Sequence, residues 1–263
     1  MSFLVVEKVG HHYFSPSSAT KALEDVSFKI DEGEFVSLLG PSGCGKTTML
    51  SILSGLIMPT IGSVTIDQKP PAYHSNLIGY MLQQDYLFPW KTIEENILLG
   101  LKLNGRLDEV SQLTALYFLE QIGLAGVEKQ FPRQLSGGMR QRAALARTMA
   151  VNPKLLLLDE PFSALDYQTK LKLEDLVFEI LKEYGKTAVL VTHDIGEAIA
   201  MSDRILLFSA NPGRLHKTFE VPNSLRKLKP FDARSTEEYN ILFQEIWKEL
   251  ESLEENSGPK SPV

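Results

Sequence analysis

The feature that most constrains this chain is the stretch Gly40-Pro41-Ser42-Gly43-Cys44-Gly45-Lys46-Thr47, which satisfies every position of the pattern GxxxxGK(S/T). The apolar run Phe35–Leu39 precedes it and a helical pattern follows, so the loop joins a strand to a helix. Glycines let successive backbone N–H groups turn towards one anion, and the helix adds the positive end of its dipole. The stretch therefore predicts a site for the phosphates of a nucleotide.

The residues of this loop divide the work of holding a triphosphate. Lys46 is expected to reach the β and γ phosphates, and the Thr47 hydroxyl to ligate Mg²⁺. The residues assigned to the nucleotide here are Gly40, Pro41, Ser42, Gly43, Cys44, Gly45, Lys46, Thr47 and Thr48.

Two adjacent carboxylates end a second apolar run. Leu155–Leu158 is followed directly by Asp159 and Glu160. Open α/β sheets place their chemistry at the C-terminal ends of strands, and successive strand residues point to opposite sides. We therefore assign Asp159 to hold Mg²⁺ through its water shell and Glu160 to polarise the attacking water.

Strand and helix patterns alternate along most of the chain. The expected strands are Val26–Ile30, Phe35–Leu39, Ser63–Ile66, Leu77–Leu82, Leu155–Leu158, Thr187–Thr192 and Arg204–Phe208. The expected helices are Lys46–Gly55, Thr92–Leu103, Leu107–Ile122, Gly137–Ala150, Gln168–Tyr184 and Ile195–Met201. This alternation is typical of an α/β core with a largely parallel sheet. From about residue 87 to 152 helical segments follow one another without a strand, which indicates an inserted helical subdomain.

Charge and composition exclude several classes of protein. Lys and Arg total 27 against 33 acidic residues, a net charge of −6, which argues against nucleic acid as the main partner. The single cysteine, Cys44, cannot form an intrachain disulfide, and no Cys/His cluster has zinc spacing. No stretch approaches the roughly 18 apolar residues of a membrane span, and the first residues lack an export signal. We expect a cytosolic protein whose link to a membrane runs through another chain.

A second glycine-rich helix start occurs in Leu135-Ser136-Gly137-Gly138-Met139. A Ser-led helix start offers a second place for an anion, although the first loop already holds the phosphates of one nucleotide. The second start is best explained if it meets the γ-phosphate held by another copy. Here the sequence resembles the ATP-binding subunits of ABC transporters, whose signature motif is LSGGQ. Met139 departs from its last position and leaves the Ser and both glycines in place.

The resemblance covers about residues 3–222, with its motifs in the family's order. The stretch Ser163-Ala164-Leu165-Asp166 resembles the D-loop, which in the family contacts the facing subunit. His193 resembles the switch histidine that contacts the γ-phosphate. Gln83 resembles the Q-loop glutamine, which joins the metal and the water, and the adjacent Gln84 is the alternative.

An aromatic residue near the start of the chain completes the site that the resemblance implies. Tyr13 resembles the aromatic that stacks on adenine, with Phe14 as the alternative and a plain core position open for either. Stacking on a π-face needs no hydrogen bonds to the base edge, which fits weak base selectivity.

The resemblance implies a fold and an activity. The fold is α/β, a P-loop NTPase (RecA-like) core with a mainly parallel sheet, an N-terminal antiparallel β portion and the helical subdomain at about 87–152, all within an ATPase domain over residues 1–222. The activity is hydrolysis of ATP with Mg²⁺, coupled to transmembrane solute transport. Two copies, a homodimer, would close head to tail, each ATP lying between one chain's phosphate loop and the other's Ser136–Gly138. The implied partners are permease subunits and an extracytoplasmic solute-binding protein, at the cytoplasmic face of the membrane.

Two short fragments point to a branch of the family. Phe88-Pro89-Trp90 and Asn211-Pro212-Gly213-Arg214 resemble the branch associated with nitrate, sulfonate and taurine uptake. In the family, the position of Leu87–Trp90 forms a groove for a helix of the membrane partner, and packing inside the helical subdomain is an equal alternative. An ABC-type mechanical ATPase without transport is the main alternative function. A kinase or GTPase is a weaker one, because no (N/T)KxD guanine-reading stretch is present.

Residues 223–263 form an extension that the ATPase motifs do not explain. Residues 235–263 hold seven glutamates and two lysines. The capping-box pattern Ser235–Glu238 predicts a helix start. One helical face carries the large apolar residues Tyr239, Leu242, Phe243, Ile246, Trp247, Leu250 and Leu253. We expect this amphipathic, acidic helix to pack on the parent domain.

Overall fold

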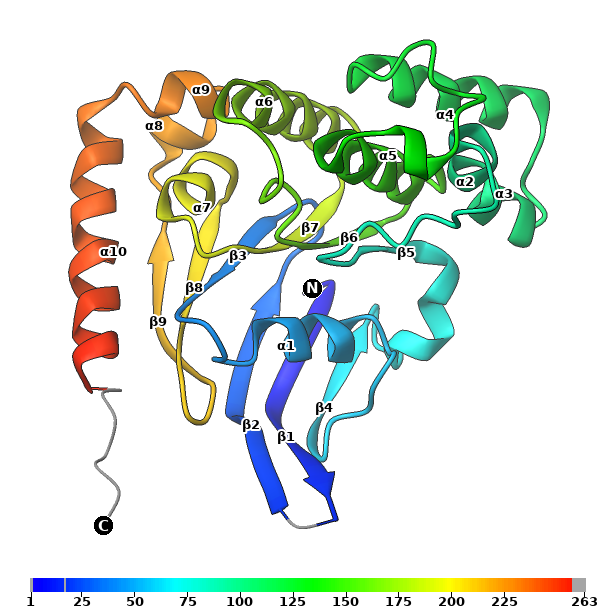
Figure 1. Cartoon of the computed structure of the whole chain (residues 1–263). Coiled ribbons are helices and arrows are strands. Elements are labelled where there is room, and N and C mark those ends of the chain that lie inside the picture. The colour runs from blue at the N-terminus through cyan, green and yellow to red at the C-terminus, as the bar shows by residue number, and fades with distance from the viewer. Residues whose placement is uncertain (1, 17, 257–263) are drawn as a thin grey trace. The chain divides into compact units, whose positions relative to one another are not determined.

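The computed structural model describes residues 2–16 and 18–256, which form two compact units (Figure 1). Of these residues, 2–16, 18–75 and 189–256 belong to the first unit, and 76–188 form the second. The chain returns from the second unit to the first within strand β7 (Thr187–Val191).

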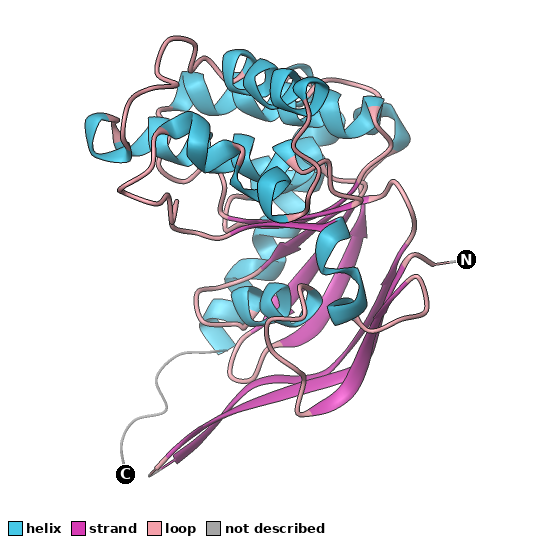
Figure 2. Cartoon of the chain, turned by 90° about the vertical axis from the view of Figure 1, so that its right-hand side faces the viewer, coloured by secondary structure: helices cyan, strands magenta, loops and turns pink. Residues whose placement is uncertain are grey.

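The first unit begins with an antiparallel sheet in the order β2-β1-β4. Strands β1 (Leu4–Ser15) and β2 (Ser18–Ile30) form a long hairpin, and β4 (Ile61–Ile66) pairs with the other edge of β1 (Figure 2). This sheet is the expected N-terminal antiparallel β portion. The hairpin extends well beyond the predicted strand Val26–Ile30. The sequence did not indicate its outer half, because that half is exposed and lacks the apolar alternation that marks a half-buried strand.

The remaining strands of the first unit continue from β3 (Phe35–Leu39), all of whose residues are buried. Strand β3 runs parallel to β8 (Arg204–Ser209), and β8 pairs antiparallel with β9 (Arg214–Glu220). Helix α1 (Lys46–Leu53) follows β3, and helix α7 (Ile195–Met201) lies in one apolar cluster with residues of β3 and β8.

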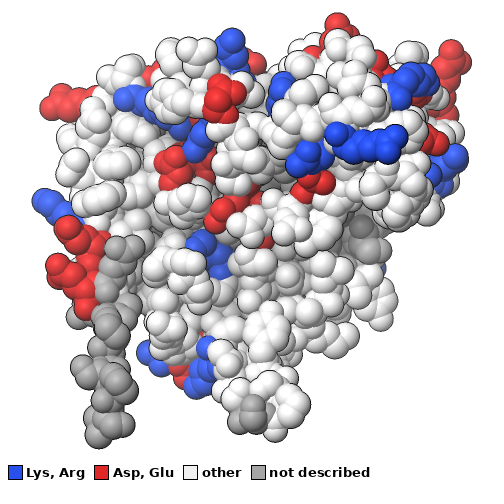
Figure 3. All heavy atoms as spheres, in the orientation of Figure 1, with Lys and Arg blue, Asp and Glu red and all other residues white. Residues whose placement is uncertain are grey.

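The first unit ends in the short helices α8 (Asn223–Arg226) and α9 (Pro230–Ala233) and the long helix α10 (Glu237–Asn256). The start of α10 differs from the prediction by one residue. The N–H of Tyr239 donates to Thr236 Oγ1 at 3.2 Å, and not to Ser235. The predicted packing of α10 on its parent unit is confirmed, since Tyr239, Leu242 and Ile246 are buried in the cluster around α7. Acidic side chains gather along α10 (Figure 3), and residues 257–263 lie outside the described part of the chain.

The second unit combines two parallel strands with helices. Strands β5 (Ile78–Met81) and β6 (Leu155–Asp159) pair in register. Its helices are α2 (Ile93–Ile97), α3 (Leu99–Leu103), α4 (Glu109–Gln121), α5 (Gly137–Ala150) and α6 (Tyr167–Glu183). Short 3₁₀ segments occur at η1 (Pro71–Leu77), which crosses the boundary between the units, and at η2 (Pro132–Gln134). The predicted helix Thr92–Leu103 is divided at Leu98 into α2 and α3.

The element types agree with the predicted fold class: parallel strands, a separate antiparallel sheet and helices in an α/β chain. Across residues 2–16 and 18–256, no helix has the length and apolar character needed to cross a membrane.

Candidate nucleotide site

The phosphate loop connects the end of β3 to the start of α1, in a conformation that requires glycine. Gly40, Gly43 and Gly45 have φ of 154°, 76° and 89°, all in the region that favours glycine. A Cβ at Gly40 would lie 2.5 Å from the carbonyl oxygen of Phe208, and one at Gly45 would lie 2.7 Å from Leu23 Cδ2. Gly45 is the N-cap of α1, and no side chain caps this helix start. The loop thus surrounds the helix start with backbone alone, which is the arrangement that binds phosphate.

Lys46 lies folded over its own loop. Its side chain is buried, and Nζ donates to the carbonyl oxygen of Gly40 at 2.6 Å and to that of Pro41 at 3.0 Å. Nζ also lies 3.5 Å from Sγ of Cys44, and burial raises the pKa of the Cys44 thiol. A buried cation held only by neutral acceptors is available to an anion that enters the loop.

The turn between β8 and β9 packs against the underside of this loop. A Cβ at Gly213 would lie 2.0 Å from the carbonyl oxygen of Cys44, so only glycine fits there. The Gly213 N–H donates to Ala22 at 3.0 Å, and its carbonyl accepts from Glu24 at 2.9 Å. The fragment Asn211–Arg214, which the sequence presented as a similarity to one branch, therefore also has a structural role beneath the phosphate loop.

Tyr13 of β1 lies beside the first turn of α1. Its hydroxyl is 3.3 Å from Thr48 Oγ1, and 48% of the residue is exposed. Phe14 is 75% exposed and stacks instead on His12. An exposed ring fixed to the phosphate-loop helix is suited to an aromatic base, and this contact favours Tyr13 over Phe14.

His193 borders the same space as the phosphate loop. A pocket of about 540 Å³ is lined by Gly40, Pro41 and Ser42 on one side and by His193 and Asp194 on another. Asp194 caps α7 by accepting the N–H of Glu197 at 3.1 Å. The first unit therefore brings the predicted switch histidine to the phosphate loop.

In the second unit, Glu160 follows β6 in an uncommon backbone conformation. Its φ is 48°, a value that costs free energy for a residue with a Cβ. Its carbonyl oxygen accepts from Gln141 Nε2 at 3.0 Å and from Ser163 Oγ at 2.9 Å. Gln83 Nε2 donates to Glu160 Oε2 at 3.3 Å, and Asp159 is buried at the end of β6. Gln83 thus contacts the carboxylate assigned as the base, which favours Gln83 over the alternative Gln84.

The Ser-Gly-Gly helix start also lies in the second unit. Ser136 caps α5 by accepting the N–H of Met139 at 3.3 Å. A Cβ at Gly138 would lie 3.2 Å from the carbonyl oxygen of Ala164, so this glycine permits the D-loop to pack closely on α5.

Sequence reasoning missed Gln141 on the same helix. Its side chain is buried, donates to the Glu160 carbonyl and accepts the N–H of Ala164 at 2.9 Å. One amide thus connects α5, the D-loop and Glu160. A glutamine on the face of α5 that is otherwise lined by Ala144 and Leu145 was the available signal, because buried polar groups need partners.

Two arginines of α5, also missed, hold the segment after Gln83. Arg140 Nε donates to Asp85 Oδ2 at 2.9 Å. Arg147 donates to the carbonyl oxygens of Tyr86 at 2.8 Å and Asp85 at 2.7 Å. The helix that begins at the signature residues is therefore bonded to the Q-loop as well as to the D-loop.

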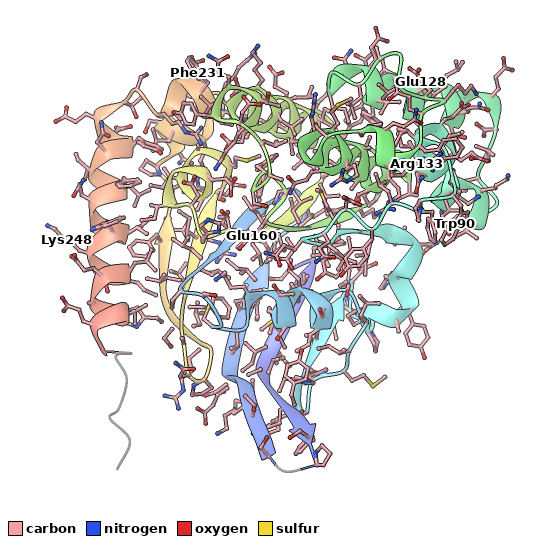
Figure 4. All side chains as sticks on the ribbon, viewed as in Figure 1. Trp90, Glu128, Arg133, Glu160, Phe231 and Lys248 are labelled. Atoms are coloured by element: carbon pink, nitrogen blue, oxygen red, sulfur yellow. The ribbon has the colours of Figure 1, made fainter. Side chains whose placement is uncertain are left out.

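For the segment Leu87–Trp90 the sequence left two alternatives open, packing inside the protein and an exposed surface for a membrane partner. The segment has one residue of each kind. Leu87 is buried, whereas Trp90 is 69% exposed and meets Phe88 edge to face at 5.4 Å (Figure 4). The Phe88 N–H donates to Asn96 Oδ1 at 2.7 Å, which fixes the backbone from which Trp90 projects.

The comparisons with known proteins agree with these motifs. The family model described as "ABC transporter" matches residues 23–163. An uncharacterized ABC transporter ATP-binding protein of Bacillus subtilis (strain 168), YtlC, is 63% identical over 97% of this chain and 98% of its own length. The taurine import ATP-binding protein TauB of Yersinia pestis bv. Antiqua (strain Antiqua) is 46% identical over 74% of this chain and 76% of its own. A dimeric structure of the ATP-binding cassette MJ0796 in a post-hydrolysis state, bound to ADP and Pi, covers 84% of this chain and 99% of its own, with 34% identity and a TM-score of 0.77. The chain therefore belongs to the ABC transporter family, as one of its ATP-binding subunits, which hydrolyse ATP.

Proposed function

We propose that this subunit powers the import of a small solute of the nitrate, sulfonate and taurine type. The observation that carries ATP binding is the phosphate loop, in which Lys46 donates only to neutral acceptors of the loop. The likeness to a protein named for taurine import, a sulfonate, supports the class of solute. The non-transport ATPase remains the outcome to be tested against it.

Within this proposal, each unit contributes its own part of the reaction. The first unit binds the nucleotide: Tyr13 stacks on adenine, residues Gly40–Thr48 hold the phosphates, and His193 contacts the γ-phosphate. The second unit supplies Glu160, which takes a proton from the attacking water while Gln83 orients its carboxylate. Lys46 and His193 meet the negative charge that grows on the γ-phosphate oxygens.

The assigned donor set also suits Mg²⁺. The residues proposed to hold it are Thr47, Gln83 and Asp159, which offer a hydroxyl, an amide and a carboxylate. These are hard oxygen donors, the kind that Mg²⁺ prefers, and a buried carboxylate such as Asp159 is favoured next to a cation. Mg²⁺ bound there would neutralise charge on the β and γ phosphates.

Two copies of the chain are proposed to close around two ATP molecules. Each site would take the phosphate loop of one copy and Ser136–Gly138 of the other, whose helix start carries no acidic residue in its first turn. The dimeric structure of MJ0796 supports this arrangement. Because ATP binds the closed dimer more tightly than the separated copies, hydrolysis would release them and perform mechanical work.

The remaining partners follow from the transport proposal. Trp90, exposed beside the fixed backbone of Phe88, is proposed to meet a helix of the permease subunits. This would place the subunit at the cytoplasmic face of the membrane, with an extracytoplasmic solute-binding protein delivering the solute and no role for nucleic acid. The ATPase domain would span residues 1–222 with its helical subdomain at about 87–152, and residues 223–263 would be an extension.

Purification from membranes tests the proposal. A tagged subunit is expected to co-purify with a multi-span permease, and ATP hydrolysis by the reconstituted pair is expected to rise with taurine, an alkanesulfonate or nitrate and a matching binding protein. Lys46→Ala serves as the control that binds permease without hydrolysis. ATP hydrolysis by a subunit that never captures a membrane protein would favour the non-transport ATPase.

A further inference from the structure

Helix α10 lies outside the stretch matched by the family model, which ends at residue 163. It nevertheless packs directly on α7, the helix that follows His193. Its residues Tyr239, Leu242 and Ile246 are buried together with Ile195 and Ala198 of α7. Helix α7 begins at Ile195 and is capped by Asp194, the residue next to His193. His193 is therefore joined to the first turn of α7 through a single residue, Asp194.

The hydroxyl of Tyr239 approaches α7 closely at Gly196. A Cβ at Gly196 would lie 2.5 Å from the Tyr239 hydroxyl oxygen and 3.9 Å from Cζ. The same point lies 3.1 Å from Asp194 Oδ1, so the hydroxyl stands against the first turn of α7 next to its capping residue. Real Cβ atoms do not come within 2.5 Å of an oxygen, so residue 196 must be glycine while Tyr239 keeps this place.

The contact with α7 continues along α10 to the phosphate loop. The rings of Tyr239, Phe243 and Trp247, here called the aromatic row, stack in sequence at centroid distances of 6.3 Å. Phe243 and Trp247 then line the pocket whose other walls are Gly40–Ser42 and His193. One helix thus contacts the segment that carries His193 and borders the loop that binds phosphate.

Acidic residues beside the apolar face of α10 contact basic residues of β9. Lys217 Nζ lies 2.8 Å from Glu249 Oε1 and 3.2 Å from Glu245 Oε1, and His216 Nε2 lies 3.2 Å from Glu249 Oε2. Lys248 projects from α10 away from these contacts (Figure 4). The helix is therefore held on two sides, by apolar packing and by ion pairs, and Tyr239 has a fixed support.

We propose that Tyr239 of α10 is a positioning residue for ATP hydrolysis, which acts on His193 through the first turn of α7. This inference rests on the proposed role of His193 at the γ-phosphate. It assigns a function to one residue of the segment 223–256, which carries no ATPase motif. Tyr239 does not line the pocket beside the phosphate loop, so its loss should slow hydrolysis while ATP binding at that loop persists.

A pair of substitutions tests the contact between Tyr239 and α7. Gly196→Ala places a methyl group against the Tyr239 hydroxyl and is expected to lower kcat about tenfold to a hundredfold, because small misplacements of reacting groups carry such costs. The ATP dissociation constant should change by less than about threefold. Adding Tyr239→Phe removes the clashing oxygen, and Gly196→Ala/Tyr239→Phe should recover kcat to within about twofold of wild type.

Matched variants separate positioning from general damage. Gly10→Ala adds a methyl group that meets nothing closer than 3.5 Å, and Lys248→Ala alters α10 on its exposed side, so both should keep the wild-type kcat. Trp247 gives a spectroscopic readout in a Trp90→Phe background, since the chain has two tryptophans. Its emission should shift in Gly196→Ala and return in the double variant.

Three results would overturn the inference: wild-type turnover by Gly196→Ala, no recovery in the double variant, or a loss of ATP affinity as large as the loss of kcat. If Gly196→Ala fails to fold, Tyr239→Ala takes its place, and wild-type turnover by that variant has the same meaning. Absence of hydrolysis in the wild-type protein would instead contradict the proposed function itself.

Discussion

Gln83 and Glu160, which are far apart in the sequence, meet through a hydrogen bond of 3.3 Å from Nε2 to Oε2. The amide of Gln83 thus contacts one of the two oxygens of the carboxylate assigned as the base. The backbone of Glu160 is fixed independently by Gln141 and Ser163. The catalytic assignment of Glu160 therefore depends on two separate sets of contacts, one to its side chain and one to its carbonyl.

Replacing the carboxylate of Glu160 tests the role of its side chain, the first of the two sets of contacts. Glu160→Gln keeps the shape of the side chain and removes its basicity, so kcat should fall by a factor of about 10² to 10⁴. ATP should still bind, and the variant should accumulate as a dimer in MgATP, because the step that separates the copies is lost. Phosphate release and sedimentation measure the two effects. Hydrolysis at the wild-type rate would remove Glu160 from the role of base.

Substitutions of Gln141 test the second set, the contacts of the Glu160 carbonyl oxygen. Gln141→Glu retains an acceptor for the Ala164 N–H and loses the donor to Glu160, whereas Gln141→Met loses both at similar volume. A buried polar group left without its partner costs about 1–3 kcal/mol, so both variants should be less stable to urea. Both should also lower kcat more than the ATP dissociation constant changes.

The matched control for Gln141 is Gln112→Met, which removes an amide from α4 that donates only a long 3.4 Å bond to Glu94. It should leave kcat unchanged. Equal losses of kcat in Gln112→Met and Gln141→Met would reduce Gln141 to a residue of general stability.

Alkylation of Cys44 should depend on pH and on nucleotide. Burial raises the pKa of the Cys44 thiol above its ordinary value, so less thiolate is present at a given pH. The rate of reaction with iodoacetamide should therefore keep increasing with pH beyond the point where a thiol in solution levels off. MgATP should slow the reaction by covering the loop.

The single cysteine supplies its own control for this measurement. In denaturant the same thiol should react faster and level off at its ordinary pKa. A folded protein whose rate levels off at the same pH as the denatured chain would show that the surroundings of Cys44 do not disfavour the thiolate.

Tyr13 should affect ATP affinity and leave the chemical step unchanged. Tyr13→Ala removes the ring and should weaken ATP binding about twofold to twelvefold, since an aromatic contact of this kind contributes roughly 0.5–1.5 kcal/mol. Tyr13→Phe keeps the ring, loses only the contact with Thr48 and should bind nearly as well as wild type. Calorimetry with a non-hydrolysable ATP analogue gives both values. If Phe14→Ala has the larger effect, the stacking residue is Phe14.

The elements that the sequence predicts well are those whose patterns are local. Strands β3 and β6 are short apolar runs buried along their whole length, and α5 and α7 start at Ser136 and Asp194, whose side chains cap them. Strand β9 was missed because only Phe219 among its residues is buried, and its backbone bonds depend on β8. Four-residue helices such as α8 have too little length for a periodic pattern.

The residues of the candidate site also fall into those with a local sequence pattern and those whose role depends on distant contacts. Motif residues such as Lys46 and Glu160 are visible in the sequence because their spacing is fixed by the loop or strand that carries them. Gln141, Arg147 and Gly213 act through contacts with distant segments, and a single sequence contains no record of which segments meet. The contact of Tyr239 with Gly196 belongs to the same class.

The close packing of Gly213 against the Cys44 carbonyl has a consequence for the synthesis of the chain on the ribosome. A ribosome delivers the chain from its N-terminus, so the phosphate loop leaves the exit tunnel long before the turn between β8 and β9 has been translated. A nascent chain that already contains every residue up to Asp166 still lacks this underlying turn. The contact between this turn and the loop can therefore form only after Gly213 has been translated and has left the exit tunnel.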